Sequence, residues 1–110
     1  LNDPGFVEAA QGLARRVVQM KAGLETDDLA RLQTAFRWTT SRSATQAELT
    51  ALADLLNTAR QHFTLDAQAA EQLATVPLGP ADDASLHVEL AAWTSVCNVL
   101  LNLDEVLMKR

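Results

Sequence analysis

The chain has 110 residues, of which 48% are hydrophobic and 21% are charged, and its formal net charge at pH 7 is −5. This length suits one domain and this composition is that of a globular protein, so a wholly disordered chain is excluded. Nine scattered Lys and Arg residues stand against fourteen Asp and Glu residues, which argues against nucleic acid or an anionic membrane surface as a partner.

The single cysteine, Cys97, excludes an internal disulfide bond and a C-x-x-C-H haem attachment within these residues. We find no apolar run that approaches the ~20 residues needed to span a bilayer, and no signal peptide. The chain starts with Leu1 and leads almost at once into a helix signal. We therefore expect residues 1–110 to form a single helical domain, the C-terminal fragment of a larger multidomain protein.

Alanine and leucine dominate the sequence and no run of alternating β-branched residues indicates a strand, so we predict an all-α fold. The first helix is expected to begin at the segment NDPGF, with Asn2 or Asp3 as its cap and Pro4 in its first turn. Gly23 is its expected end. Its apolar residues recur at helical spacing, at Phe6, Ala10, Leu13, Val17 and Met20.

The second helix is expected to begin within ETDDLARL, capped by Thr26 or Asp27, because acidic residues complement the positive end of a helix. Its inner face is expected to carry Leu29, Leu32, Phe36 and Thr39 or Thr40. Trp38 lies off that line, so it either packs against a neighbouring helix or lies on the surface.

The third helix has the clearest start, because Thr45 to Glu48 (TQAE) match a capping box, in which two end amides are satisfied reciprocally. Its apolar residues then recur at helical spacing, at Leu49, Leu52, Leu56, Ala59 and Phe63.

A short fourth helix is expected from Asp66 to about Ala74, with Leu73 as its main anchor. The helix-breaking residues Pro77, Gly79 and Pro80 follow, and the last helix is expected from near Ser85 to about Met108. The prediction is thus a small helical bundle of four long helices and one short helix.

One residue on the last helix departs from its apolar stripe. At 3.6 residues per turn, Asp104 falls in line with four apolar residues, Trp93, Cys97, Leu100 and Leu107. A desolvated carboxylate can act as a general acid or base. We favour instead a buried or half-buried ion pair with Arg42, with Arg37 as the second choice of partner, which would lock the last helix in place.

Other candidates are better explained by structure than by chemistry. His62 and His87 are remote in sequence and lack a cluster of ligands beside them, so a surface or capping role is expected. Cys97 and Trp93 lie on the apolar stripe and are expected in the core. Trp38 is the candidate interface residue, because tryptophan is enriched at binding hot spots.

Three segments, LNDPGFVEAAQGLARRV, AFRWTTSRSATQAELTAL and AAWTSVCNVLLNLDEVLMKR, together resemble a known family. They are similar to the C-terminal part of the planctomycete cytochrome c-associated PSD domain, a bacterial domain of unknown function. The family pattern has an arginine followed by Thr-x-x-Glu, which matches Arg42, Thr45 and Glu48. Its ending, Leu-Asn-x-Asp-Glu, matches residues 101 to 105. Ser41 departs from the pattern, because the family often has Gly there.

The resemblance implies a large exported protein, periplasmic or otherwise extracytoplasmic, in which haem c belongs to the missing upstream part. It implies no haem ligand, no cofactor and no catalytic residue in this segment.

Three functions remain for these residues. We favour a non-catalytic structural or interaction module that docks onto upstream domains of its own chain or onto another protein. The second is an enzyme active site shared with upstream domains, to which Asp104 or Glu105 supplies a carboxylate. The third is a free-standing adaptor whose groove accepts a partner helix. We identify no metal site and no small-molecule ligand, and we do not expect this segment alone to be an enzyme.

Overall fold

The computed structural model describes residues 4–20 and 28–108, without the side chains of Pro4, Phe6 and residues 104–108. Its helices are α1 (Pro4–Gln19), α2 (Asp28–Thr40), α3 (Gln46–Leu65), α4 (Ala67–Thr75), the 3₁₀ helix η1 (Ala84–Leu86) and α5 (His87–Met108). These residues contain no strand, which confirms the all-α prediction. The expected caps of the first two helices, at residues 2, 3, 26 and 27, lie outside the described residues, as does Gly23.

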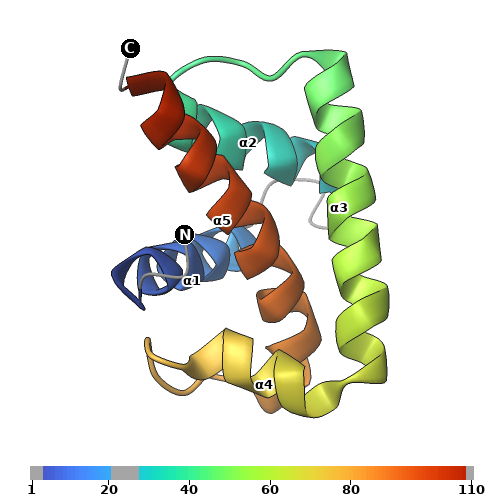
Figure 1. The fold of residues 1–110 in the computed structure, drawn as a ribbon. Helices are drawn as coiled ribbons and strands as arrows, with labels where there is room; N and C mark the ends of the chain where they lie inside the picture. The colour runs from blue at the N-terminus through green and yellow to red at the C-terminus, as the bar shows by residue number, and fades with distance from the viewer. Residues whose placement is uncertain (1–3, 21–27, 109–110) are drawn as a thin grey trace.

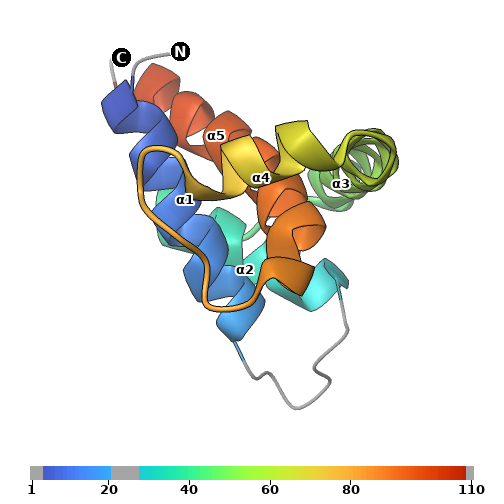
Figure 2. The ribbon, with the colours of Figure 1, turned by 90° about the horizontal axis from the view of Figure 1, so that it is seen from below.

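The helix α5 runs through the middle of the molecule and packs against each of α1, α2, α3 and α4 (Figures 1 and 2). Its buried apolar residues therefore face several directions: Leu90, Ala91, Ala92, Trp93, Val96, Cys97 and Leu100. The stretch Ala84–Leu103 is long and apolar enough to cross a membrane by length and composition, which the sequence analysis did not expect. Its central position accounts for this composition, because α5 packs against four other helices and buries apolar side chains in several directions.

The surrounding helices each bury one apolar stripe against α5 and one another. The stripes predicted for α1, α2 and α3 are largely confirmed, and the buried side chains include Ala10, Val17, Leu32, Phe36, Leu52, Leu56, Ala59 and Phe63. Leu29 is an error of the sequence prediction: it was placed on the inner face of α2, and it is 47% exposed. In α4 the close contacts come from Ala70 and Ala74, whereas Leu73 is only partly buried.

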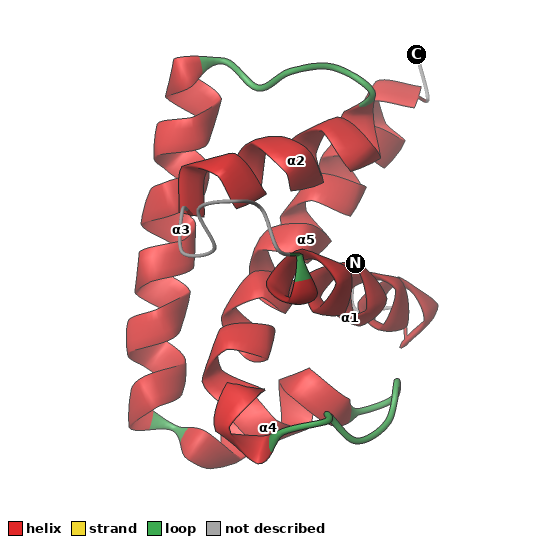
Figure 3. Ribbon diagram, turned by 180° about the vertical axis from the view of Figure 1, so that it is seen from behind, coloured by secondary structure: helices red, strands yellow, loops and turns green. Residues whose placement is uncertain are grey.

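The start of α3 agrees with the sequence prediction. The side chain of Thr45 accepts a hydrogen bond from the backbone N–H of Glu48, and the carboxylate of Glu48 accepts one from the N–H of Thr45. The loop that leads into this cap from α2 is visible from behind (Figure 3). It begins at Ser41, whose φ of 64° lies in the left-handed region that favours glycine.

Two polar side chains of α1 hold the segment that follows α4. The amide nitrogen of Gln11 donates to the carbonyl groups of Leu73 and Val76, and its oxygen accepts from the N–H of Leu78. Arg15 donates to the carbonyl groups of Ala74 and Gly79. Gln11 is 1% exposed, and all three of its hydrogen bonds satisfy its buried side-chain amide. In return, Gln11 supplies hydrogen-bond partners that backbone groups at the end of α4 would otherwise lack.

Candidate functional site

The first candidate residue, Arg42, lies in a local network at the start of α3. Its guanidinium group donates to both carboxylate oxygens of Glu48, at 3.0 and 2.9 Å, and stacks over the ring of Phe36. The hydrogen bonds from Arg42, followed by that from Thr45, lower the pKa of Glu48 to about 2. The Arg, Thr and Glu of the family-like pattern therefore cooperate in one helix cap.

The sequence analysis expects Asp104 to form an ion pair with Arg42, or with Arg37 as the second choice. The side chains of Asp104 and Glu105 lie outside the described residues, so this pairing stays a prediction, as does a shared active site that uses either carboxylate. The backbone brings the relevant segments close together, because Phe36 of α2 lines a small apolar pocket with Leu100 and Leu103 of α5. Arg37 is exposed and donates to the hydroxyl group of Ser43 at 3.3 Å.

A second charged network, which the sequence analysis missed, joins three helices. Arg60 of α3 donates to both carboxylate oxygens of Asp28 at the start of α2, at 2.7 and 3.0 Å. It also donates to both oxygens of Glu89 in the first turn of α5, each at 2.7 Å. The hydrogen bonds that Arg60 donates to Asp28 and then to Glu89 raise the pKa of Arg60, and the bond from Arg60 lowers the pKa of Asp28. Arg60 lies four residues after the buried Leu56 and three before the buried Phe63. This helical spacing was a signal that Arg60 lies beside the buried face of α3.

Trp38, the candidate interface residue, lies partly exposed on α2. The guanidinium carbon of Arg16, on α1, lies 4.6 Å from the centre of its ring, so the ring has a cation–π neighbour on an adjacent helix. The residue as a whole is 42% exposed. Both readings of Trp38 thus hold in part, since it contacts a neighbouring helix and also reaches the surface.

The remaining candidates lie apart from one another. Cys97 and Trp93 are fully buried, as predicted, and burial raises the pKa of the Cys97 thiol to about 12, which makes it a poor nucleophile. His62 is exposed and packs edge-on against Phe63. Among the side chains that the structure describes, which leave out those of Asp104 and Glu105, no three His, Cys, Asp or Glu come together in a way that could hold a metal ion.

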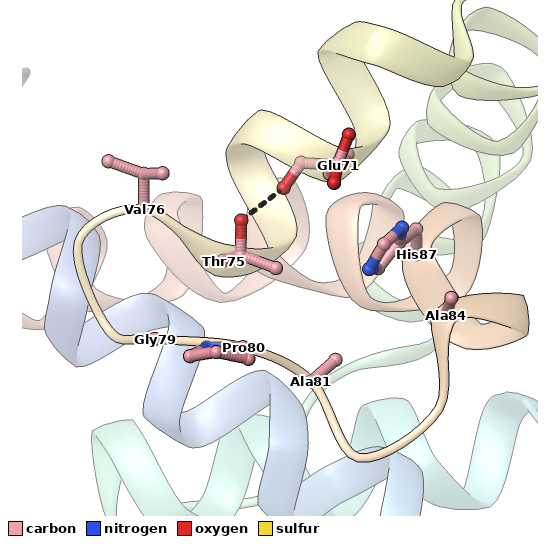
Figure 4. Close-up of a pocket in the computed structure, with 8 residues that line it drawn as sticks. All are labelled: Glu71, Thr75, Val76, Gly79, Pro80, Ala81, Ala84 and His87. Atoms are coloured by element: carbon pink, nitrogen blue, oxygen red, sulfur yellow. Dashed lines mark hydrogen bonds between the residues drawn. The ribbon is translucent and has the colours of Figure 1, made fainter.

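A pocket of about 480 Å³ lies between α4, the loop that follows it and the start of α5 (Figure 4). Two ionisable side chains line it from different helices, Glu71 from α4 and His87 from the first turn of α5. Thr75 and Gly79 also line it, and four apolar residues complete the wall: Val76, Pro80, Ala81 and Ala84. Its volume lies within the range of about 300–1,000 Å³ that is typical of ligand pockets.

The hydrogen bonds from α1 fix one wall of this pocket. Gln11 and Arg15 hold the carbonyl groups of Val76 and Gly79, and both of these residues line the pocket. Asp83 begins the other end of the loop, where its carboxylate accepts from the N–H of Ser85, which lowers the pKa of Asp83. Hydrogen bonds therefore hold both ends of the loop, and Asp83 places a carboxylate in this loop next to the lining residue Ala84.

The sequence analysis did not identify Glu71 and His87 as a pair. The uneven distribution of charge along the chain was a signal that could have drawn attention to this region. Residues 1–60 contain seven Asp and Glu and seven Lys and Arg, whereas residues 61–108 contain seven Asp and Glu and no Lys or Arg. The half of the chain that builds the pocket is therefore strongly acidic.

A scan against models of protein families and searches of curated proteins and solved structures found no match to this chain. The resemblance to the cytochrome c-associated domain therefore stays an expectation.

Proposed function

We propose that this chain is a non-catalytic structural and interaction module, in which a small helical bundle presents Trp38 to a protein partner. The observation that carries the proposal is the Arg16–Trp38 contact. It places a large, partly exposed aromatic ring on the surface with a cation stacked against it. Tryptophan and arginine are the side chains that most often supply binding energy at protein interfaces.

The charged networks support a structural role for the rest of the domain. The network of Arg60 joins α2, α3 and α5, and that of Arg42 fixes the start of α3. These groups are committed to one another, so they hold the helices that position the surface around Trp38.

The partner that we propose is the upstream part of the same gene product. This choice rests on the resemblance of the three sequence segments to a domain that follows cytochrome c domains in exported proteins. It carries the expectation of an extracytoplasmic location and of haem c in those upstream domains.

The test is site-specific crosslinking in the full gene product, expressed in its own host. The photoreactive residue p-benzoylphenylalanine replaces Trp38 in one variant and Asp54 in the control, because Asp54 is an exposed residue of a different helix, α3. We expect one recurrent crosslinked peptide from position 38, identified by mass spectrometry, and none from position 54. No crosslink at position 38, or the same scattered products at both positions, would contradict the proposal.

A further inference from the structure

We propose that the pocket lined by Glu71 and His87 binds a lysine or arginine side chain carried by a segment of the partner protein. This inference rests on the proposed interaction function, and it names the chemistry of a second contact. The pocket lies beside α4, and α2 with its Trp38 lies toward the opposite end of the molecule (Figure 1). The two contacts can therefore be tested separately.

The lining of the pocket matches a long cationic side chain. Val76, which is 51% exposed, and the neighbouring Pro80 and Ala81 offer apolar contact to an aliphatic stem. Glu71 offers an exposed carboxylate, for which the structure gives no ion partner among the described residues. The imidazole of His87 in its neutral form offers one nitrogen as an acceptor. An ammonium or guanidinium group supplies donors to both.

The charge around the pocket favours the same ligand. The chain between residues 61 and 108 contains no Lys or Arg, and Asp82 and Asp83 lie in the loop that forms one wall. The guanidinium group bonded to this loop, that of Arg15, is committed to the carbonyl groups of Ala74 and Gly79. A cationic side chain would therefore enter an acidic region in which no described Lys or Arg lines the pocket.

The shape of the pocket favours a side chain of a protein over a small free cation. The pocket is a concavity on the surface, open to solvent, so a small molecule would stay largely hydrated there. A peptide segment adds backbone and neighbouring side chains that cover the exposed Val76 at the rim. The loop wall is already held by Gln11 and Arg15, so binding does not require the ordering of this segment.

The test uses the acetylated, amidated peptide Ala-Lys-Leu-Lys-Ala as the probe, with Ala-Gln-Leu-Gln-Ala and n-butylamine as comparison ligands. Titrations of the ¹⁵N-labelled protein are followed by NMR at low salt. We expect the lysine peptide to shift the amide signals of Glu71, Thr75 and His87 at lower concentration than either comparison ligand. Absence of these shifts, or equal binding of n-butylamine, would overturn the proposal.

Two charge-matched variants locate the interaction. Glu71→Gln should weaken binding of the lysine peptide about tenfold, because it removes a charge-assisted hydrogen bond. Asp54→Asn removes the same charge from an exposed site on α3 and should change binding by less than about twofold. His87→Gln, a second variant in the pocket, should also weaken binding. Equal losses in Glu71→Gln and Asp54→Asn would show general electrostatic attraction and refute a defined site.

The results also separate this inference from the proposed function. A crosslink at position 38 without peptide binding at the pocket would contradict the cationic site alone. Peptide binding at the pocket without a crosslink at position 38 would contradict the role of Trp38 and leave the cationic site supported.

Discussion

The guanidinium group of Arg60 and the carboxylate of Asp28 are joined by two hydrogen bonds of 2.7 and 3.0 Å, although 32 residues separate them in the chain. The same guanidinium group binds Glu89, so one side chain of α3 connects the starts of α2 and α5. The side chains are 26% to 35% exposed, which places this network between a surface ion pair and a buried one.

Replacement of Arg60 by methionine should lower the free energy of unfolding by about 1–2 kcal/mol. This magnitude lies between the small value of an exposed ion pair and the larger cost of breaking a buried one, because solvent screens the remaining carboxylates. Urea unfolding followed by circular dichroism measures it. Arg37→Met is the matched control, since Arg37 is exposed, and it should change stability by less than about 0.5 kcal/mol. Equal effects of the two substitutions would contradict a stabilising role for the network.

Acid should destabilise the protein through Asp28 and Glu48. Hydrogen bonds from Arg60 and Arg42 respectively lower the pKa values of these carboxylates in the folded state, that of Glu48 from 4.5 to about 2. Their stabilising contribution is complete above the ordinary pKa values and is lost as the pH falls through the lowered ones. The free energy of unfolding should therefore be nearly constant from pH 7 to about 5 and should decrease between about pH 4.5 and 2.

The contribution of Glu48 to this pH dependence can be isolated. Glu48→Gln removes the carboxylate and Arg42→Met removes the group that lowers its pKa, so each variant should lose stability less steeply between pH 4.5 and 2. Urea unfolding at a series of pH values provides the measurement. A slope equal to that of the unmodified protein in both variants would show that the Arg42–Glu48 pair does not contribute.

Replacement of Gln11 by leucine should be more costly than the loss of one hydrogen bond. The variant leaves the carbonyl groups of Leu73 and Val76 and the N–H of Leu78 without their partner, and we expect a loss of about 2–4 kcal/mol. Hydrogen exchange should show lost protection at the amide of Leu78 in particular. Gln68→Leu, at an exposed position of α4, is the control. Unchanged protection of Leu78 would contradict this role.

Replacement of Ser41 by glycine should stabilise the protein by about 0.5–1 kcal/mol, because the left-handed backbone at Ser41 costs a side chain more than it costs glycine. Ser43→Gly is the control, because Ser43 has no positive φ and the added chain entropy should lower stability. Thermal unfolding of the two variants gives the comparison, and a loss of stability in Ser41→Gly would contradict the prediction.

The thiol of Cys97 should react with Ellman's reagent only when the protein opens. It is fully buried and its pKa is raised to about 12, so the folded protein holds almost no thiolate at pH 8. The labelling rate should be far below that of a free cysteine and should rise with urea to the rate of the unfolded chain. Rapid labelling of the folded protein would mean that α5 is not sealed by its neighbours.

Features determined by a few neighbouring residues could be predicted from the sequence, and those determined by the packing of distant segments could not. The cap at Thr45 and Glu48 depends on four residues, and it was predicted correctly. The burial of Trp93 and Cys97 follows from helical spacing within α5. The prediction for Leu29 was wrong because this residue lies at the start of α2, and spacing alone does not show how far the neighbouring helices extend over that end.

The charged and polar contacts between distant segments could not be predicted from spacing rules. Arg60 finds its partners 32 and 29 residues away, and Gln11 binds a turn more than 60 residues away. Glu71 and His87 line one pocket only because the intervening loop returns along α4 and α1. The sequence nevertheless contained a sign of an unusual region, in the absence of Lys and Arg from residues 61–108.

The position of α5 has a consequence for biosynthesis. Each of the other four helices packs against it, and it is the last of them to leave the ribosome. While α5 is still inside the ribosomal exit tunnel, the apolar faces of α1 to α4 lack the helix against which they pack. These faces therefore stay without their common partner until translation passes the final turns of α5, and a truncated product that lacks α5 should be a substrate for proteolysis.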